Sequence, residues 1–441
     1  METGGPSSAT IDRLSSLPGN VIDNILSCLS TKEAARTSCL SKHWKEKWHT
    51  VSCIVLEEKM LSERMQSQIE GIITYILTKH AGDIEICSLS VGTVKFFYDM
   101  KSWMWRLSRK SVQELTLKVQ RGTRHDVPLD LFFCEQLRHL TLRYFLFRPP
   151  CTFRGFRNLV NLDLKKITIS KEALESLLAS CPQLETLIVK KLSCVDHLHI
   201  NASNLKYLSF GGEFKSMCFN TPLLTVLSLN MYRIVSEQNN FDLRFIIRGL
   251  PPAIEELYVR CPFKKFLAAG NRLAQVSTCY NNVTTLGLDE FCFKQMDQVS
   301  CLLSLIQCFP NLQLLEIKAC SCDNEAAQAA VLEFWEEDKH PTCSLDQLCN
   351  ARVRSFHGDD SEMRFIKFVM ANSPKLNEMT VEPIINPDYN EIVIIAQLMD
   401  LPQASEKGKV NYVAYNPHVN SGDFSDEDGD SSDDAYSSES E

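Results

Sequence analysis

The sequence predicts an α/β solenoid, in which strand–turn–helix units stack so that their strands form one curved parallel sheet with helices outside it. The first observation is a six-residue phrase with apolar residues at its first, fourth and sixth positions. It occurs at residues 137–142, 159–164 and 184–189. Because its last two apolar positions alternate with other residues, the phrase has the period of a strand with one buried face.

The second observation is that the phrase recurs at intervals of about 20 to 30 residues. Such recurrence is typical of leucine-rich repeats, whose units bury a continuous core only when they stack. The longer interval from Leu312 to Val353 indicates an interrupted or replaced repeat. The phrase begins at Ile86, Val112, Leu137, Leu159, Leu184, Leu205, Leu224, Ile254, Val283, Leu312, Val353 and Leu376.

The third observation is a constant connection between helix and strand. Ser170 can cap a helix that ends at Pro182, and the next phrase begins two residues later at Leu184. A second apolar helix face ends at Pro310 in the same way. Proline stops a helix and biases the residue before it toward extended structure. We therefore predict leucine-rich repeats over residues 51–340.

Composition narrows the class of protein. The chain has 441 residues, its first ten hold no apolar run, and no stretch approaches the roughly 18 apolar residues of a membrane helix. We therefore expect no membrane partner and a location in the nucleus and/or cytoplasm. Without a secretory signal, we expect the 18 cysteines to be reduced thiols. Because they include no C-x-x-C pair, we expect no metal site, and we also expect no cofactor.

The net charge of −9 is concentrated in residues 422–441, which hold nine acids and no Lys or Arg. The rest of the chain is nearly neutral, so we expect no nucleic-acid partner. We predict disorder for residues 1–10 and for the acidic tail, residues 401–441. Ser425, Ser431 and Ser438 each precede an acid by three residues, a pattern that acidophilic kinases favour. The alternative is a plain solubilising tail.

Residues 11–50 have a different pattern, which predicts three short helices. Pro18 fits the first turn of one helix and Thr31 can cap a second. Trp44 and Trp48 lie four residues apart and therefore on one side of a third. Three helices of this length form too small a core to be comfortable alone. We therefore expect a partner that covers their exposed apolar surface.

The residue string of this segment is specific. It reads Leu-Ser-Ser-Leu-Pro at residues 14–18, Ile-Leu-Ser-Cys-Leu-Ser-Thr-Lys at 25–32 and Ala-Arg-Thr-Ser-Cys-Leu-Ser-Lys-His-Trp at 35–44. This string closely resembles the F-box of plant F-box/leucine-rich-repeat proteins. It departs from the usual phrase at Ser30, where proline is common, and at His43, where arginine is common.

The resemblance implies that this F-box, residues 11–50, docks on the Skp adaptor of a cullin–RING ubiquitin ligase. The alternative is that the three helices only close the N-terminal end of the solenoid, as repeat proteins require. The resemblance assigns adaptor binding to Leu14, Leu17, Pro18, Val21, Ile22, Ile25, Leu26, Leu29, Leu40 and Trp44.

The end of the repeat region also resembles this family. The string Phe-Ile-Lys-Phe-Val-Met-Ala-Asn-Ser-Pro-Lys-Leu at residues 365–376 reads as helix, proline and strand. It resembles the C-terminal FBD domain of the same plant proteins, which implies an FBD-like region at residues 341–400. Two degenerate terminal repeats are an equal interpretation of the same residues.

The sequence holds no enzyme motif that we recognise, such as a P-loop or a G-x-S-x-G turn. His197 and His199 are two residues apart, with no other candidate ligand beside them. Histidines in such an arrangement usually lie on the surface or form hydrogen bonds within the core. We therefore expect a non-catalytic subunit of a Skp–cullin–F-box ubiquitin ligase, whose repeats capture an unknown protein substrate. The alternatives are a repeat protein without a ligase link and a receptor that needs a small molecule.

The last expectation concerns the inner curve of the solenoid. The residue that follows the last apolar position of each phrase points away from the core. In four successive repeats this residue is Lys118, Arg143, Lys165 and Lys190, and two later repeats hold Arg260 and Lys318. We expect the first four to stack as a basic column that binds an anion. The candidate anions are an acidic or phosphorylated segment of the substrate, a small phosphate ligand and the chain's own acidic tail. Asp163 and Glu114, on the same face, can neutralise part of it. The alternative is that these long side chains only solvate strand ends.

Overall fold

The computed structural model describes residue 14 and residues 16–92, 97–231, 247–260, 279–320, 325–336, 345–384 and 391–413. The chain divides into two compact units, residues 1–287 and 288–441. The predicted disorder of residues 401–441 is wrong at the start of this segment, because Lys409–Tyr412 form a strand of the sheet. The predicted disorder of residues 1–10 and the proposed phosphorylation of Ser425, Ser431 and Ser438 fall outside the described residues.

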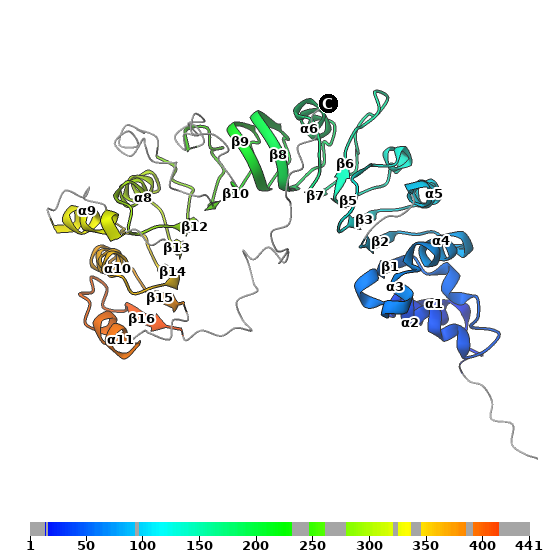
Figure 1. The fold of residues 1–441 in the computed structure, drawn as a ribbon, viewed down its shortest axis with the longest axis horizontal. Coiled ribbons are helices and arrows are strands. Elements are labelled where there is room, and N and C mark those ends of the chain that lie inside the picture. Colours follow the sequence, from blue (N-terminus) through cyan, green and yellow to red (C-terminus); the bar gives the residue numbers. More distant parts are fainter. Residues whose placement is uncertain are drawn as a thin grey trace, which may run out of the picture. The chain divides into compact units, whose positions relative to one another are not determined.

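A parallel sheet of 14 strands confirms the predicted α/β repeat fold, and its strands follow one another in sequence order (Figure 1). A two-stranded sheet, β4 (His125–Asp126) with β6 (Phe145–Leu146), lies outside this order. The 14 strands are β1 (Cys53–Glu57), β2 (Ile86–Val91), β3 (Glu114–Val119), β5 (His139–Arg143), β7 (Asn161–Lys165), β8 (Thr186–Asn201), β9 (Tyr207–Asn220), β10 (Val226–Asn230), β11 (Glu256–Arg260), β12 (Thr285–Phe291), β13 (Leu314–Ala319), β14 (Asn350–Phe356), β15 (Glu378–Pro383) and β16 (Lys409–Tyr412).

Helices precede the first strand and then lie between many of the successive strands, as in a strand–turn–helix repeat (Figure 1). The α-helices are α1 (Gly19–Ser27), α2 (Thr31–Arg36), α3 (Glu63–Gln66), α4 (Ile69–Lys79), α5 (Phe97–Leu107), α6 (Lys171–Ala179), α8 (Met296–Cys308), α9 (Glu325–Glu336), α10 (Asp360–Asn372) and α11 (Glu391–Met399). The 3₁₀ segments are η1 (Thr37–Cys39), η2 (Lys47–Thr50), η3 (Glu58–Met60) and η4 (Leu129–Phe133).

The strands have two unlike faces, because side chains alternate along each strand. In β5 the core-facing Leu140 and Leu142 are fully buried, and in β7 Leu162 and Leu164 are too. We call this the core face. The residues between them are half-buried and form what we call the open face. The predicted phrase therefore marks the core face of each strand correctly in these repeats.

Two of the predicted phrase starts are wrong in register. Ile86 pairs with Glu114, which places it on the open face, and the buried Ile84 is the true start of its phrase. Asn350 pairs with Leu314, so the second start is Leu348 rather than Val353. In that repeat Ala351 fills a core position that holds a larger residue elsewhere, which hid the pattern.

Strands β8 and β9 differ from the others because each continues into its own return segment. Their pairing extends from Thr186 with Tyr207 to Asn201 with Asn220, and it is irregular between Val189 and Val195. A straight strand of the length of β8 would span about 50 Å, which the next five residues cannot cross back. The strand must therefore bend at the irregular pairs, and a strand replaces the helix in this repeat.

Helix caps confirm one predicted start and correct two others. The Ser170 hydroxyl accepts a hydrogen bond from the Ala173 backbone N–H and caps α6 as expected. Pro18 is the N-cap of α1 rather than a residue of its first turn. Ser30, not Thr31, caps α2, because Ser30 and Glu33 form a reciprocal capping box.

Candidate protein-binding surfaces

The N-terminal helices enclose a small core of their own. Ile22 and Leu26 of α1 are fully buried, and Trp44 and Trp48 are almost so. The Trp44 indole N–H donates a hydrogen bond to the backbone carbonyl of Leu14, 3.3 Å away. The predicted third helix is only a 3₁₀ turn, η2, that contains Trp48. This hydrogen bond therefore joins the segment before α1 to the segment that follows α2 and η1.

The ten residues that the resemblance assigns to adaptor binding divide by exposure. Ile22, Leu26 and Trp44 are buried within the domain, so they support the surface from below and cannot themselves touch a partner in this conformation. This narrows the assignment, because an amphipathic pattern identifies apolar residues without showing which of them form the inner layer. The half-buried members are Leu17, Val21 and Leu29, and the exposed ones are Leu14, Pro18, Ile25 and Leu40.

The N-terminal helices also attach to the first strand of the sheet. The Thr31 hydroxyl accepts a hydrogen bond from the backbone N–H of Val55 in β1. Nearby, the His80 ring lies against this junction with its Nε2 atom 2.8 Å from the carbonyl oxygen of Val51. Burial lowers the pKa of His80, and the Val51 hydrogen bond only partly opposes this. The junction is therefore built around a neutral imidazole.

The predicted basic column exists on the open face of the first unit. Lys118 pairs with Arg143, Arg143 with Lys165, and Lys165 with Lys190, so the four residues stand in one row across β3, β5, β7 and β8. All four are half-buried. The open-face residues of these strands are Glu114, Thr116, Lys118, His139, Thr141, Arg143, Asn161, Asp163, Lys165, Thr186, Ile188 and Lys190.

Asp163 is the acid within this row of bases. Its carboxylate forms an ion pair with Lys165, at an N···O distance of 3.3 Å. Burial raises the pKa of the Asp163 carboxyl, and the charges of Lys165, Lys190 and Lys118 oppose that rise. Glu114 lies four residues before Lys118, roughly 13 Å away along an extended strand. Of the two acids on the described open-face positions of these strands, Asp163 is therefore the one close enough to compensate the column strongly.

After three of the four column members, the next residue has a left-handed backbone conformation. Tyr144, Lys166 and Lys191 follow Arg143, Lys165 and Lys190 and have φ values of 71°, 53° and 56°. The Tyr144 N–H donates to the Lys165 carbonyl, and the Lys166 N–H to the Lys190 carbonyl. We call these three residues the rim. Their backbone is held by the neighbouring strand although only glycine adopts this φ without strain.

Arg124 lies beside the rim residue Tyr144. The Tyr144 hydroxyl donates to the Gly122 carbonyl, and the Arg124 guanidinium lies over the Tyr144 ring, 4.9 Å from its centroid. Arg124 also donates to the Thr168 hydroxyl. These contacts hold Arg124 next to the end of β5 although it is exposed.

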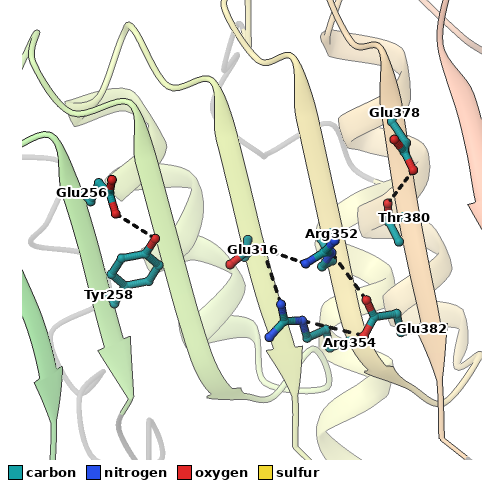
Figure 2. Close-up of polar contacts among 8 residues, drawn as sticks. All are labelled: Glu256, Tyr258, Glu316, Arg352, Arg354, Glu378, Thr380 and Glu382. Carbon is teal, nitrogen blue, oxygen red and sulfur yellow. Dashed lines mark hydrogen bonds and ion pairs between the residues drawn. The ribbon is translucent and has the colours of Figure 1, made fainter. Parts of the chain in front are cut away.

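The open face of the second unit carries a different, internally paired set of charges. Glu316 of β13 lies 3.3 Å from Arg352 and 3.7 Å from Arg354 of β14, and Glu382 of β15 lies 3.5 Å and 3.7 Å from the same two arginines. Figure 2 shows each arginine between the two carboxylates. The open-face residues of these strands are Leu314, Glu316, Lys318, Asn350, Arg352, Arg354, Glu378, Thr380 and Glu382.

The sequence reasoning missed this network for an identifiable reason. The wrong start at Val353 removed Arg354 from the column position, whereas the start at Leu348 places it there, paired with Lys318. Lys318 itself lies 3.8 Å from the Asp289 carboxylate. Arg260, the other late column residue, pairs with Asn230 of β10. The column position therefore holds bases in two groups of strands. In the first group all four residues are basic, and in the second the bases lie between Asp289 and Glu382.

A polar hollow lies at the opposite ends of the same strands from the basic column. It has a volume of about 420 Å³ and is lined by residues that precede β3, β5, β7 and β8. Asn158, one of them, donates to the Glu135 carbonyl of the preceding repeat. Asn204 and Asn282 make the same contact, to Pro182 and Pro252. These asparagines connect repeats and were not singled out in the sequence.

Two other polar side chains, His197 and Glu362, form hydrogen bonds within the protein. His197 Nδ1 lies 2.6 Å from the Ser216 hydroxyl, as expected of a structural histidine. The buried Glu362 carboxylate accepts from three backbone N–H groups, those of His357, Gly358 and Asp359. Within the described ranges, no group of three or more His, Cys, Asp or Glu side chains is arranged to hold a metal, and no helix is long and apolar enough to cross a membrane.

The cysteines behave as small buried or surface groups rather than as a reactive set. Burial raises the pKa of Cys134 and of Cys301 to about 12 and that of Cys181 to about 11, so these thiols stay protonated. Cys292 is disulfide-bonded, which corrects the expectation that all thiols are reduced. Spacing along the chain does not reveal such a bond, because it depends on proximity in the fold.

Three family models match the chain, in the order that the structure shows. The model described as "F-box domain" matches residues 14–55. The model described as "FBD-associated F-box protein At5g56370, LRR repeats" matches residues 100–317, and the one described as "FBD" matches residues 336–381. The first covers the N-terminal helices and the first half of β1, the second contains the basic column, and the third contains β14 and α10.

Whole-length relatives occur in Arabidopsis thaliana. The "F-box/FBD/LRR-repeat protein At1g13570" is 32% identical, over 91% of this chain and 98% of its own length. The "FBD-associated F-box protein At4g10400" is 24% identical over 91% of this chain and 100% of its own length. The "FBD-associated F-box protein At5g22730" is 23% identical over 90% of this chain and 94% of its own length. The chain therefore belongs to the plant family of F-box/FBD/LRR-repeat proteins.

Proposed function

We propose that this protein is the substrate-recognition subunit of a Skp–cullin–F-box ubiquitin ligase. Its F-box docks on the Skp adaptor, and its repeats present a protein substrate. The protein is a non-catalytic component, because the recruited RING protein and conjugating enzyme transfer the ubiquitin. Membership of the F-box family supports the adaptor contact.

The observation that carries the proposal is the exposure of large apolar side chains on a domain whose core is already closed. Leu14 is 51% and Leu40 57% exposed, although Ile22 and Leu26 are fully buried in the same domain. Apolar side chains left outside a complete core are typical of a surface that a partner covers. Since each leucine is about half exposed, covering both would contribute roughly 1.5–3 kcal/mol.

The test compares two pairs of exposed leucines. We expect L14Q combined with L40Q to weaken binding to a purified Skp adaptor at least tenfold, because roughly 1.4 kcal/mol corresponds to a factor of ten. The matched control combines L129Q with L223Q, which are 59% and 48% exposed in the repeats and should leave adaptor affinity unchanged. Equal losses in both double variants, or none in the first, would refute the assignment.

The second candidate function is a repeat protein in which the helices serve only as a cap. The hydrogen bond from Val55 to Thr31 favours a capping role, because it occupies the outer edge of β1. Capping and adaptor binding use different residues, so both can hold in one molecule. If wild-type protein fails to bind any Skp adaptor while it unfolds as a single cooperative unit, the helices are a cap alone.

The third candidate is a receptor that needs a small molecule. The polar hollow before β3, β5, β7 and β8 is the feature that favours it. Substrate capture that survives removal of all small molecules from the preparation, by denaturation and refolding on a column, would exclude this alternative.

A further inference from the structure

The two open faces of the sheet differ in charge balance. The open-face positions of β3, β5, β7 and β8 hold four bases and two acids, and those of β13, β14 and β15 hold three bases and three acids. In the second unit the arginines are enclosed by Glu316 and Glu382 (Figure 2). In the first unit, Asp163 is the one acid beside the row among the described open-face positions of these four strands. The basic column therefore has an excess of positive charge.

The four positive charges of the column lie close together, because neighbouring strands are only about 4.8 Å apart. Cross-strand pairs of like charge oppose one another and lower stability. The pairs Lys118–Arg143, Arg143–Lys165 and Lys165–Lys190 are all of this kind. The four column positions hold four cations, and Asp163 adds one carboxylate beside them. An anion bound along the row would relieve all three repulsive contacts.

The rim adds positive charge at the same edge. Lys166 and Lys191 occupy left-handed positions next to the column, and Arg124 is held over the Tyr144 ring. The equivalent positions of the second unit, after Asp289 and Arg354, hold Glu290 and Ser355. The column and the rim together thus form a basic surface that the corresponding positions of the second unit do not repeat.

We propose that the basic column and the rim bind an acidic segment of the substrate protein, which lies extended across β3, β5, β7 and β8. The proposal rests on the proposed function, in which the repeats capture the substrate, and names the chemical class that they recognise. Contacts are made by side chains, because these strands already pair with neighbours on both sides.

The dimensions fix the spacing of the acids. Three steps between strands of about 4.8 Å span roughly 14 Å. An extended peptide that rises about 3.3 Å per residue covers this distance in about five residues. Side chains two apart point the same way, so acids at positions i, i+2 and i+4 face the column together. Each acid then lies between two successive bases.

The experiment uses the full-length protein in complex with the Skp adaptor. The probe is a fluorescent peptide, Gly-Asp-Ser-Asp-Ser-Asp-Gly, and its partner has asparagine in place of each aspartate. We expect the acidic probe alone to bind, and its affinity to fall at least tenfold between 50 and 300 mM salt, because screening weakens exposed ion pairs. The combined variant R143E, K165E and K190E should lose at least tenfold and should instead bind a lysine version of the peptide.

Two further variants act as controls on charge. The combination K79E, K206E and K367E changes net charge by the same amount at exposed residues outside the column and should keep probe affinity within about twofold, since distant charges are screened. The variant D163N removes the acid within the row and should strengthen probe binding severalfold. If both triple variants lose affinity equally, only bulk charge is being measured and the proposal fails.

The remaining arms distinguish other anions. Inorganic phosphate or a single-stranded oligonucleotide that displaces the probe at equal concentration of charge would overturn the assignment to an acidic peptide. The chain's own residues 414–441 are a second source of acids, and probe binding that appears only after their deletion would assign the column to that segment instead. Adaptor binding is measured on every variant. A wild-type protein that binds the adaptor but not the acidic probe refutes this proposal alone, whereas a wild-type protein that binds the probe but not the adaptor refutes only the ligase function.

Discussion

The hydroxyl oxygen of Thr31 accepts a hydrogen bond from the backbone N–H of Val55, at a distance of 2.8 Å. Thr31 begins α2, and Val55 is the central residue of β1, the first strand of the sheet. An N–H on the outer edge of a first strand has no neighbouring strand to accept it. The F-box thus completes the edge of the sheet with one side chain.

We expect T31V to lower the free energy of unfolding by about 1–3 kcal/mol, because the isosteric change leaves the Val55 N–H without its partner. T37V is the matched control. Its hydroxyl donates to the Ala34 carbonyl, which also accepts a backbone N–H, so its loss should cost less. The measurement is urea unfolding together with hydrogen exchange at Val55. An unchanged exchange rate in T31V would show that the contact contributes nothing.

Two histidines should respond to pH in opposite directions. Burial lowers the pKa of His80, so its contribution to stability is complete above the ordinary value near 6.5 and is lost as pH falls below it. The hydrogen bond to Glu362 raises the pKa of His357, so its contribution is complete below the ordinary value and is lost as pH rises through the raised one.

Unfolding free energies of wild type, H80Q and H357Q between pH 5 and 8 check this pair of expectations. Relative to wild type, H80Q should flatten the loss of stability on the acid side, and H357Q the loss on the alkaline side. Direct titration of both rings by NMR gives the same answer independently. Two rings that titrate together near pH 6.5 would contradict both assignments.

The arginine–glutamate network should be worth more than an isolated surface pair. We expect E316Q to destabilise the second unit by about 1–2 kcal/mol, because both arginines lose a half-buried carboxylate. The control is E185Q, whose partner Lys206 is 54% exposed and which should cost no more than about 1 kcal/mol. Chemical unfolding at low and high salt measures both. Equal costs would mean that the network adds nothing to its separate pairs.

The left-handed rim should tolerate glycine better than a β-branched residue. Lys166 has a φ of 53°, which strains any residue with a Cβ atom and strains β-branched residues most. We expect K166V to destabilise by roughly 1–2 kcal/mol and K166G to change stability by less than about 1 kcal/mol. Thermal unfolding of K166V and K166G tests this difference in stability. K206V serves as the control at an ordinary position beside a strand.

Sequence periodicity predicted the fold because the alternation of apolar residues along each strand is visible in the sequence itself. The same period placed Lys118, Arg143, Lys165 and Lys190 in one row, which the pairing of β3, β5, β7 and β8 confirms. It failed where one core position is small, as at Ala351, because a small residue does not stand out from its neighbours. That error alone concealed the place of Arg354.

Other features depended on contacts between distant parts of the chain. Thr31 looked like a helix cap, and its actual partner, Val55, belongs to another element. The apolar residues of α1 were identified correctly, but only packing shows that Ile22 and Leu26 lie inside while Ile25 does not. The bend of β8 likewise follows from pairing with β9, since its residues alone do not mark a turn.

The last strand of the described sheet, β16, forms its far edge. β16 comes last in the strand order, pairs with β15 and exposes Lys409. Such an edge is a template on which a second copy can add a strand and begin to aggregate. The chain continues beyond it into residues 422–441 with nine acids. Two copies that meet at this edge bring both acidic segments together, so their repulsion opposes fibre growth until salt screens it.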